Sequence, residues 1–235
     1  MNDKKIIAVI PARGGSKGIP KKNITLLNKK PLIAYSIDTA FKSKYIQRVI
    51  VSTDDKEIAK IAEKNGAEII NRPKELAQDK TPDLPVFQHI IKTLKENEKY
   101  KPEIIINLRP TCPLRSVEDI DKSVKKILDT NCDSVRTITK AKHHPYWMGK
   151  LINDKLKPFI DDIDVQKYYQ RQLLPDAYII NGGVDVMKAE IIEKEKSLYG
   201  KDIRAVFMPE ERSIDIDTNL DIYIAETILK RRNKK

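Results

Sequence analysis

The sequence predicts an α/β protein with a mostly parallel central sheet that helices cover on both faces. Two observations support this fold class. Short apolar runs alternate with segments of helical periodicity, and the runs are rich in Ile and Val, as is typical of strands buried on both faces. The length of 235 residues fits one domain spanning 1–235, or one domain with a sizeable insertion.

The predicted elements follow one another in the order that such a fold requires. The apolar runs predict strands over residues 5–10, 46–52, 67–70, 103–108, 133–138, 178–187 and 203–208. Between and after them, helical patterns predict helices near 31–43, 54–65, 83–97, 116–129 and 218–232. The helix near 116–129 shows the apolar spacing most clearly, at Val117, Ile120, Val124 and Ile127.

Three of the predicted helices start at residue pairs with the spacing of a capping box. In that motif the first side chain bonds the backbone of the fourth residue, and the fourth side chain bonds back. The pairs are Asp54 with Glu57, Ser116 with Asp119, and Thr218 with Asp221. Each pair predicts a helix N-terminus at its first residue.

The alternation of strands and helices stops at residues 139–177. This segment concentrates aromatic side chains, at Tyr146, Trp147, Phe159, Tyr168 and Tyr169. Within it, Asn153-Asp154 separates two short runs and predicts a hairpin turn. An aromatic-rich hairpin inserted in an α/β sheet is expected to serve as a lid or as a dimerisation arm.

The first predicted strand leads directly into a basic, glycine-rich loop. Residues 10–23 read IPARGGSKGIPKKN, with three glycines, one arginine and three lysines. Glycines let backbone N–H groups turn toward an anion, and basic side chains neutralise phosphate charge. The loop matches neither the P-loop nor the dinucleotide fingerprint, and Pro20 disfavours a helix through Ile19. A solvated basic turn is the alternative; the composition favours a polyphosphate site, as for a nucleotide.

Arginines follow two further predicted strands at what would be the same edge of the sheet. Arg72 follows strand 67–70, and Arg109 and Arg115 follow strand 103–108. In open α/β sheets, ligands bind outside the carboxyl ends of the strands. Each arginine alone could be a surface or packing residue, but their shared position predicts that they converge on one crevice.

A second constellation pairs carboxylates near the end of the chain. In Ser213-Ile214-Asp215-Ile216-Asp217-Thr218, apolar and acidic residues alternate, so an extended chain places both carboxylates on one face, roughly 6.5 Å apart. Mg²⁺ usually takes one or two carboxylates together with substrate phosphates. The alternative is that Asp217 or Thr218 only caps the last helix. Beside a phosphate loop, the metal interpretation is favoured.

Composition excludes several other classes of protein. No stretch is long and apolar enough to span a bilayer, and we expect a cytoplasmic protein without a membrane partner. Cys112 and Cys132 lack zinc-ligand spacing and are expected to be reduced. The net charge of +11 suggests nucleic acid, but lysines and acidic residues are interleaved along the chain, so no nucleic-acid partner is expected.

Four segments together resemble the CMP-sialic acid synthetases, or acylneuraminate cytidylyltransferases. They are similar to the family's motifs, come in the family's order and span nearly the whole chain. The segments are Ile10 to Asn23, Leu108 to Arg115, Gln170-Arg171-Gln172-Leu173-Leu174-Pro175 with Asn181-Gly182, and Ser213 to Asp217.

The resemblance implies a Rossmann-like nucleotidyltransferase domain in which 139–177 is an inserted dimerisation hairpin, and therefore a homodimer. It implies a reaction that joins CTP to a nonulosonic (sialic-acid-like) sugar acid, giving CMP-sugar and pyrophosphate. The implied CTP-binding residues are Ala12, Arg13, Gly14, Ser16, Lys17, Lys22, Asn23, Arg72 and Arg109. The implied sugar-binding residues are Arg109, Arg171 and Asn181, with Arg171 reaching into the other subunit's site. Asp215 and Asp217 match the Mg²⁺ ligands, and Arg13, Lys17 and Asp217 are the candidate catalytic residues.

The chain departs from the family where the sugar would bind. Many sialate-type members carry an arginine two residues before the Asn-Gly pair, where it holds the sugar carboxylate, and Ile179 stands there in this chain. The identity of the sugar acid is therefore open. The alternatives are activation of another acid sugar, such as 3-deoxy-manno-octulosonate, or a non-catalytic nucleotide- or nucleic-acid-binding protein.

Overall fold

The protein contains a seven-stranded sheet of order β11-β7-β10-β6-β1-β4-β5. The structure is a computed structural model that describes residues 4–232. In chain order the strands are β1 (Ile6–Pro11), β4 (Arg48–Thr53), β5 (Glu68–Asn71), β6 (Ile104–Asn107), β7 (Ser134–Lys140), β10 (Tyr178–Lys188) and β11 (Ile203–Phe207). Within the described residues, β10 is the one strand of this sheet that runs antiparallel to its neighbours. The mostly parallel α/β sheet expected from the sequence is confirmed.

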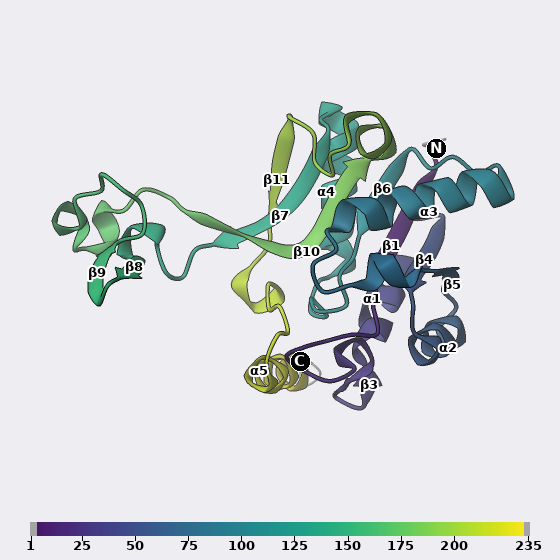
Figure 1. The fold of residues 1–235 in the computed structure, drawn as a ribbon, viewed down its shortest axis with the longest axis horizontal. Helices are drawn as coiled ribbons and strands as arrows, with labels where there is room; N and C mark the ends of the chain where they lie inside the picture. The colour runs from purple at the N-terminus through teal and green to yellow at the C-terminus, as the bar shows by residue number, and fades with distance from the viewer. Residues whose placement is uncertain (1–3, 233–235) are drawn as a thin grey trace.

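Helices cover both faces of this sheet (Figure 1). They are α1 (Leu32–Phe41), α2 (Lys56–Lys64), α3 (Asp83–Glu98), α4 (Val117–Thr130) and α5 (Asn219–Arg232). One face packs against α1, α2 and α4, and the other packs against α3. Helix α5 packs separately, against the loop after β1 and the segment that contains Ile216. A short hairpin that the sequence did not predict, β2 (Leu26–Leu27) with β3 (Lys30–Pro31), follows that loop.

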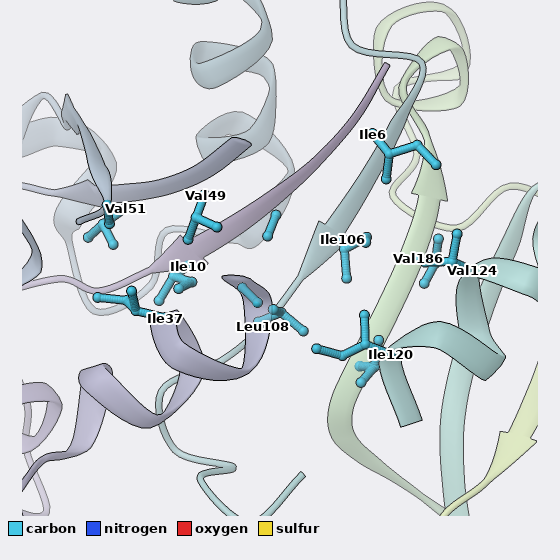
Figure 2. Packing of buried hydrophobic residues seen from close by; sticks show 14 of the residues in the cluster. Ile6, Ile10, Ile37, Val49, Val51, Ile106, Leu108, Ile120, Val124 and Val186 are labelled. Atoms are coloured by element: carbon cyan, nitrogen blue, oxygen red, sulfur yellow. The ribbon is translucent and has the colours of Figure 1, made fainter. Parts of the chain in front are cut away.

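The two faces of β1 fill two different hydrophobic cores. Ile6 and Ile10 point into the core under α1, α2 and α4, where Figure 2 shows them among Ile37, Val49 and Ile106. Ile7 and Val9 belong to the opposite core, under α3. Because successive strand residues alternate in direction, a strand covered on both faces must be apolar throughout. This is why the run Ile6–Ile10 carries no polar residue.

Two of the three predicted capping boxes are confirmed and one is wrong. Ser116 and Asp119 cap α4 reciprocally, and Thr218 and Asp221 do the same at the start of α5. At α2 the capping residue is Asp55, whose carboxylate accepts from the N–H groups of Glu57 and Ile58. The preceding Asp54 accepts instead from the N–H of Gly14, so it anchors the glycine-rich loop.

The interruption between β7 and β10 projects away from the sheet (Figure 1). We call residues 141–177 the arm; β7 extends to Lys140, two residues into the segment predicted as the insertion. The arm contains the hairpin β8 (Gly149–Ile152) with β9 (Lys155–Pro158). Its turn residues Asn153 and Asp154 both have positive φ, 46° and 63°, as the sequence predicted for a tight hairpin turn.

The carboxyl ends of β1, β4, β5 and β6 lie at one edge of the sheet, because these strands are parallel neighbours. At this edge the glycine-rich loop follows β1 and Asp54 follows β4. Arg72 follows β5, and Arg109 comes two residues after the end of β6. Four segments that are far apart in sequence are therefore brought to one place.

Candidate active site

A cavity of about 550 Å³ opens at the carboxyl edge of the sheet. Eight of the residues singled out from the sequence line it: Arg13, Ser16, Lys17, Lys22, Asn23, Arg72, Arg109 and Asp217. They come from the loop after β1, the ends of β5 and β6, and the segment before α5. The expected convergence on one crevice is thus observed for Arg72 and Arg109.

Arg115 does not take part in this convergence, so this part of the expectation is wrong. Its side chain is buried, and its guanidinium donates to the hydroxyl of Ser36 and to the backbone carbonyl of Arg109. Arg115 therefore stabilises the turn after β6 by linking its backbone to α1. Its short distance in sequence from Arg109 gave no information about the direction of its side chain.

Two cations of the glycine-rich loop meet a single carboxylate in the cavity. Arg13 Nη1 lies 2.9 Å from Asp79 Oδ1, and Lys17 Nζ lies 2.8 Å from Asp79 Oδ2. The hydrogen bond from Lys17 is the main cause that lowers the pKa of the Asp79 carboxyl from its ordinary value, so Asp79 is ionised at neutral pH. Asp79 was not among the site residues expected from the sequence, because a lone acidic residue in a loop belongs to no motif.

The loop is also tied to the segment that contains the carboxylate pair. Lys22 Nζ donates to Asp217 Oδ1 over 2.8 Å, and Lys22 is mostly shielded from solvent. Asn23 is buried and donates from Nδ2 to the backbone carbonyl of Arg13 over 2.9 Å. Lys22 and Asn23, at the C-terminal end of the glycine-rich loop, therefore stabilise its conformation.

Gly18 is the position where the loop comes closest to Asp217. A Cβ placed on Gly18 would lie 2.7 Å from the backbone carbonyl oxygen of Asp217, a contact that the backbone must move to relieve. At Gly15, in the same loop, a Cβ would meet nothing within 4 Å.

Substitution at these two glycines therefore has different expected outcomes. Gly18→Ala should lower the free energy of unfolding of the ligand-free protein by about 1–3 kcal/mol, the cost of forcing a methyl group into a packed contact. Gly15→Ala should change it by less than about 0.5 kcal/mol. Denaturant titration of both variants gives the comparison, and equal stabilities would show that the loop does not rest on Asp217.

Arg72 is held rigidly at the back of the cavity. Its Nε donates to the hydroxyl of Ser52 over 3.1 Å and its Nη2 donates to the Ser52 carbonyl over 2.8 Å. Burial lowers the pKa of Arg72 from its ordinary value, against the opposing effect of nearby carboxylates such as Asp54. A guanidinium stays protonated at neutral pH even so, and Arg72 places a fixed positive charge at this wall.

Arg109 is placed between two carboxylates. Its Nη2 lies 3.0 Å from Asp83 Oδ2 and 3.8 Å from Asp185 Oδ2. Burial opposes the charged form of Arg109, but the charges of Asp185 and Asp83 outweigh it and raise the pKa of the guanidinium. Asp185 is itself fully buried and accepts from Arg136 Nε over 3.0 Å. Asp185 was not among the site residues expected from the sequence, although its isolation as an acidic residue in an apolar strand was a signal that could have pointed to it.

Several expected site residues lie outside the cavity. Ala12 is buried in the core, and the N–H of Gly14 is occupied by Asp54. Asn181 is buried, and its amide binds the hydroxyls of Thr137 and Ser213. Arg171 lies in the arm, where it lines a second cavity of about 490 Å³ and donates to the carbonyl of Lys142.

The two carboxylates proposed from the sequence differ in their surroundings. Ile216 is buried between Asp215 and Asp217, which are both exposed, as the alternation predicted. Asp217 lines the main cavity, whereas Asp215 Oδ1 lies 3.7 Å from the thiol of Cys112. Burial raises the pKa of that thiol to about 12, so Cys112 stays neutral beside the carboxylate. Both cysteines are free, as expected.

The donors present suit a cation that also binds a ligand. Among residues 4–232, no group of three or more His, Cys, Asp and Glu side chains is placed to hold a metal ion by itself. Mg²⁺, however, needs only one or two protein carboxylates when substrate phosphates supply further oxygens. Asp217 lines the cationic cavity and Asp215, two residues before it, is also exposed, so the pair fits that donor set.

Comparison with known proteins agrees with this geometry. The sequence profile of the family described as cytidylyltransferase matches residues 7–230. The chain belongs to the cytidylyltransferase family. The resemblance identified from the four motifs is confirmed, and so is the assignment as a nucleotidyltransferase enzyme.

Curated relatives of this cytidylyltransferase cover nearly its whole length. The chain is 34% identical to a CMP-N,N'-diacetyllegionaminic acid synthase of Campylobacter jejuni, with 97% of each chain covered. It is 33% identical to the post-translational flagellin modification protein B of Campylobacter coli, again with 97% of each covered. It is 32% identical to an N-acylneuraminate cytidylyltransferase of Escherichia coli, covering 98% of this chain and 54% of that protein.

Solved structures share the fold of this cytidylyltransferase at low sequence identity. A CMP:2-keto-3-deoxy-manno-octonic acid synthetase complexed with CTP superposes with a TM-score of 0.71 at 15% identity, covering 97% of this chain and 100% of that one. The 4-diphosphocytidyl-2C-methyl-D-erythritol synthase of Anaerococcus prevotii gives a TM-score of 0.63 at 19% identity, covering 97% and 99%. Within residues 4–232, no helix combines the length and apolarity that crossing a bilayer requires.

Proposed function

We propose that this cytidylyltransferase joins CTP to a nonulosonic, sialic-acid-like sugar acid and releases pyrophosphate. The observation that carries the proposal is the cavity itself, where Arg13, Lys17, Lys22, Arg72 and Arg109 face one space that also contains Asp217. Relatives that span this chain at 32–34% identity are named for CMP-sugar synthesis with legionaminic and neuraminic acids. The cytoplasmic location expected from the sequence belongs to this proposal.

The proposed reaction forms one P–O bond and breaks another at the α-phosphorus of CTP. The anomeric hydroxyl of the sugar attacks, pyrophosphate leaves with the electron pair of the broken bond, and the hydroxyl proton passes to solvent or to a nearby carboxylate. Such transfers depend on positioning and charge neutralisation more than on covalent help from the protein. Arg13 and Lys17, paired with one shared carboxylate in the ligand-free protein, would neutralise the leaving pyrophosphate.

Asp215 and Asp217 would hold a Mg²⁺ ion together with the phosphates of the nucleotide. When bound there, the ion would supply charge neutralisation at the α-phosphate and lower the pKa of the attacking hydroxyl. Lys22, which donates to Asp217 over 2.8 Å, orients that carboxylate toward the cavity. The position of Asp217 within the cavity supports a direct part in the reaction for it, as metal ligand or as base.

The sugar acid would bind beside Arg109, whose charge is held in place by Asp83 and Asp185. Asn181 would act from the adjoining strand, where its amide fixes Ser213 near the carboxylate pair. Ile179, which stands where an arginine is usual in sialate-type relatives, does not line the cavity. The carboxylate of the sugar therefore depends on Arg109, on Arg171, or on both.

The arm would bring Arg171 to the site of a second copy. Several large apolar side chains on the arm are exposed in the single chain, with Leu151 at 70% and Leu156 at 78%. Contiguous exposed apolar surface of this kind marks protein interfaces. A homodimer, paired through an arm inserted into an otherwise single domain, is part of the proposal.

The test is pyrophosphate release from CTP and Mg²⁺ with a panel of sugar acids. The panel contains N-acetylneuraminate, legionaminate, pseudaminate and 3-deoxy-manno-octulosonate. We expect release with one of the first three. Release with the last alone would reassign the enzyme to another class of acid sugar. Absence of CTP binding would contradict the proposal altogether.

A further inference from the structure

Asp79 occupies the position between the two loop cations where a phosphate group would be expected. Each of its carboxylate oxygens pairs with a different cation, Oδ1 with Arg13 at 2.9 Å and Oδ2 with Lys17 at 2.8 Å. The cations belong to the loop after β1, whereas Asp79 comes from the segment between β5 and α3. One anion therefore bridges two cations across the mouth of the cavity, as a phosphate oxygen pair would.

The surroundings of Asp79 allow the carboxylate to leave. Among residues 4–232, its side chain has no polar partner apart from those two cations, and it is 43% exposed. The short turn that carries it is closed by its own bonds, from Thr81 to the carbonyls of Gln78 and Glu75. Rotating the carboxylate out of the cavity breaks none of these bonds.

The segment is also open to solvent on its other side. Asp79, Gln78 and Gly15 border both the main cavity and a neighbouring one of about 550 Å³, which Asp54 and Lys74 also line. Asp79 therefore lies between two neighbouring cavities, and the second cavity offers space for its side chain when a ligand displaces it.

We infer that Asp79 is a placeholder for the pyrophosphate moiety of the nucleotide. This inference rests on the proposed function. In the ligand-free protein the single charge of Asp79 balances part of the charge of Arg13 and Lys17. Pyrophosphate, or the pyrophosphate moiety of CTP, must displace Asp79 to reach the two cations, whereas CMP lacks that moiety and does not compete with Asp79.

The experiment compares binding of inorganic pyrophosphate, CTP and CMP to the wild type and to Asp79→Asn by calorimetry. The asparagine keeps the shape of the side chain and removes its charge. The substitution removes the two ion pairs that Asp79 makes with Arg13 and Lys17, which a bound phosphate must otherwise break. The Kd values of pyrophosphate and CTP should therefore fall about three- to tenfold. The Kd of CMP should change less than twofold. Glu75→Gln is the matched control, because it makes the same charge change in the same segment and Glu75 pairs with neither cation.

Three outcomes would overturn the inference. They are an unchanged or weaker affinity of Asp79→Asn for pyrophosphate, an equal gain in Glu75→Gln, and a gain for CMP as large as that for CTP. The binding measurement separates failure of this inference from failure of the proposed function, because binding of inorganic pyrophosphate does not require turnover of a sugar acid. Tighter binding by Asp79→Asn in a protein that turns over no sugar acid would support the placeholder and contradict the proposed reaction.

Discussion

Replacing Arg13 with alanine is expected to lower kcat/KM for CTP about ten- to a hundredfold. A hydrogen bond to a charged group contributes about 1.5–3 kcal/mol, which corresponds to that change in rate. Arg13 is one of the two cations that meet at Asp79, and its backbone is held by Asn23. Its removal therefore takes away charge from the leaving pyrophosphate while the loop keeps its support.

The matched control for Arg13 is Lys21→Ala in the same loop. Lys21 pairs with Glu57 on α2 and does not line the cavity, so its loss removes an equal charge from outside the site. We expect kcat/KM to stay within twofold of the wild type. Steady-state pyrophosphate release measures both variants. A near-normal kcat/KM for Arg13→Ala would remove the loop from the mechanism.

Replacing Asp217 with asparagine should have a larger effect, a loss of about a hundred- to a thousandfold in kcat. The reason is that stabilisation of developing charge by a metal ion is worth several kcal/mol, and an amide is a far weaker ligand for Mg²⁺ than a carboxylate. Asp217 is the member of the carboxylate pair that lines the cavity. The chelator EDTA should abolish the activity of the wild type.

Two measurements separate loss of a metal ligand from loss of the ion pair with Lys22. The Mg²⁺ concentration that gives half-maximal activity should rise in Asp217→Asn, which a purely structural ion pair would not cause. Glu211→Gln, an exposed acid in the preceding turn that does not line the cavity, should leave both activity and Mg²⁺ dependence unchanged. Full activity of the wild type in EDTA would refute the metal assignment for Asp215 and Asp217.

Local patterns in the sequence accounted for the strands of the large sheet and for the five α-helices. Strand and helix positions follow from apolar periodicity, which depends on neighbours along the chain, and the Ser116 and Thr218 caps follow from spacing alone. The error at α2 has a simple cause. Asp54 and Asp55 are both suitable capping residues, and the choice was decided by Gly14, whose N–H Asp54 accepts from 40 positions away.

The direction of side chains accounts for the other differences. Arg109 and Arg115 lie in one short segment, yet Arg109 faces the cavity and Arg115 turns toward Ser36 in α1. Which way each points depends on what the neighbouring helices leave open, and such packing carries no short-range signature. For the same reason the pairing of Asp185 with Arg136 and Arg109 could not be expected from the sequence.

The sequence by itself therefore determined a mostly parallel α/β sheet, a basic, glycine-rich loop after its first strand and a pair of exposed carboxylates near its end. All three depend on residue type and spacing within a short stretch of chain. Only the tertiary structure decided that Asp79 bridges Arg13 and Lys17, and that β10 runs antiparallel and carries Asp185 beneath Arg109. These are contacts between segments tens of residues apart, and their energies depend on distance in space, which spacing along the chain does not specify.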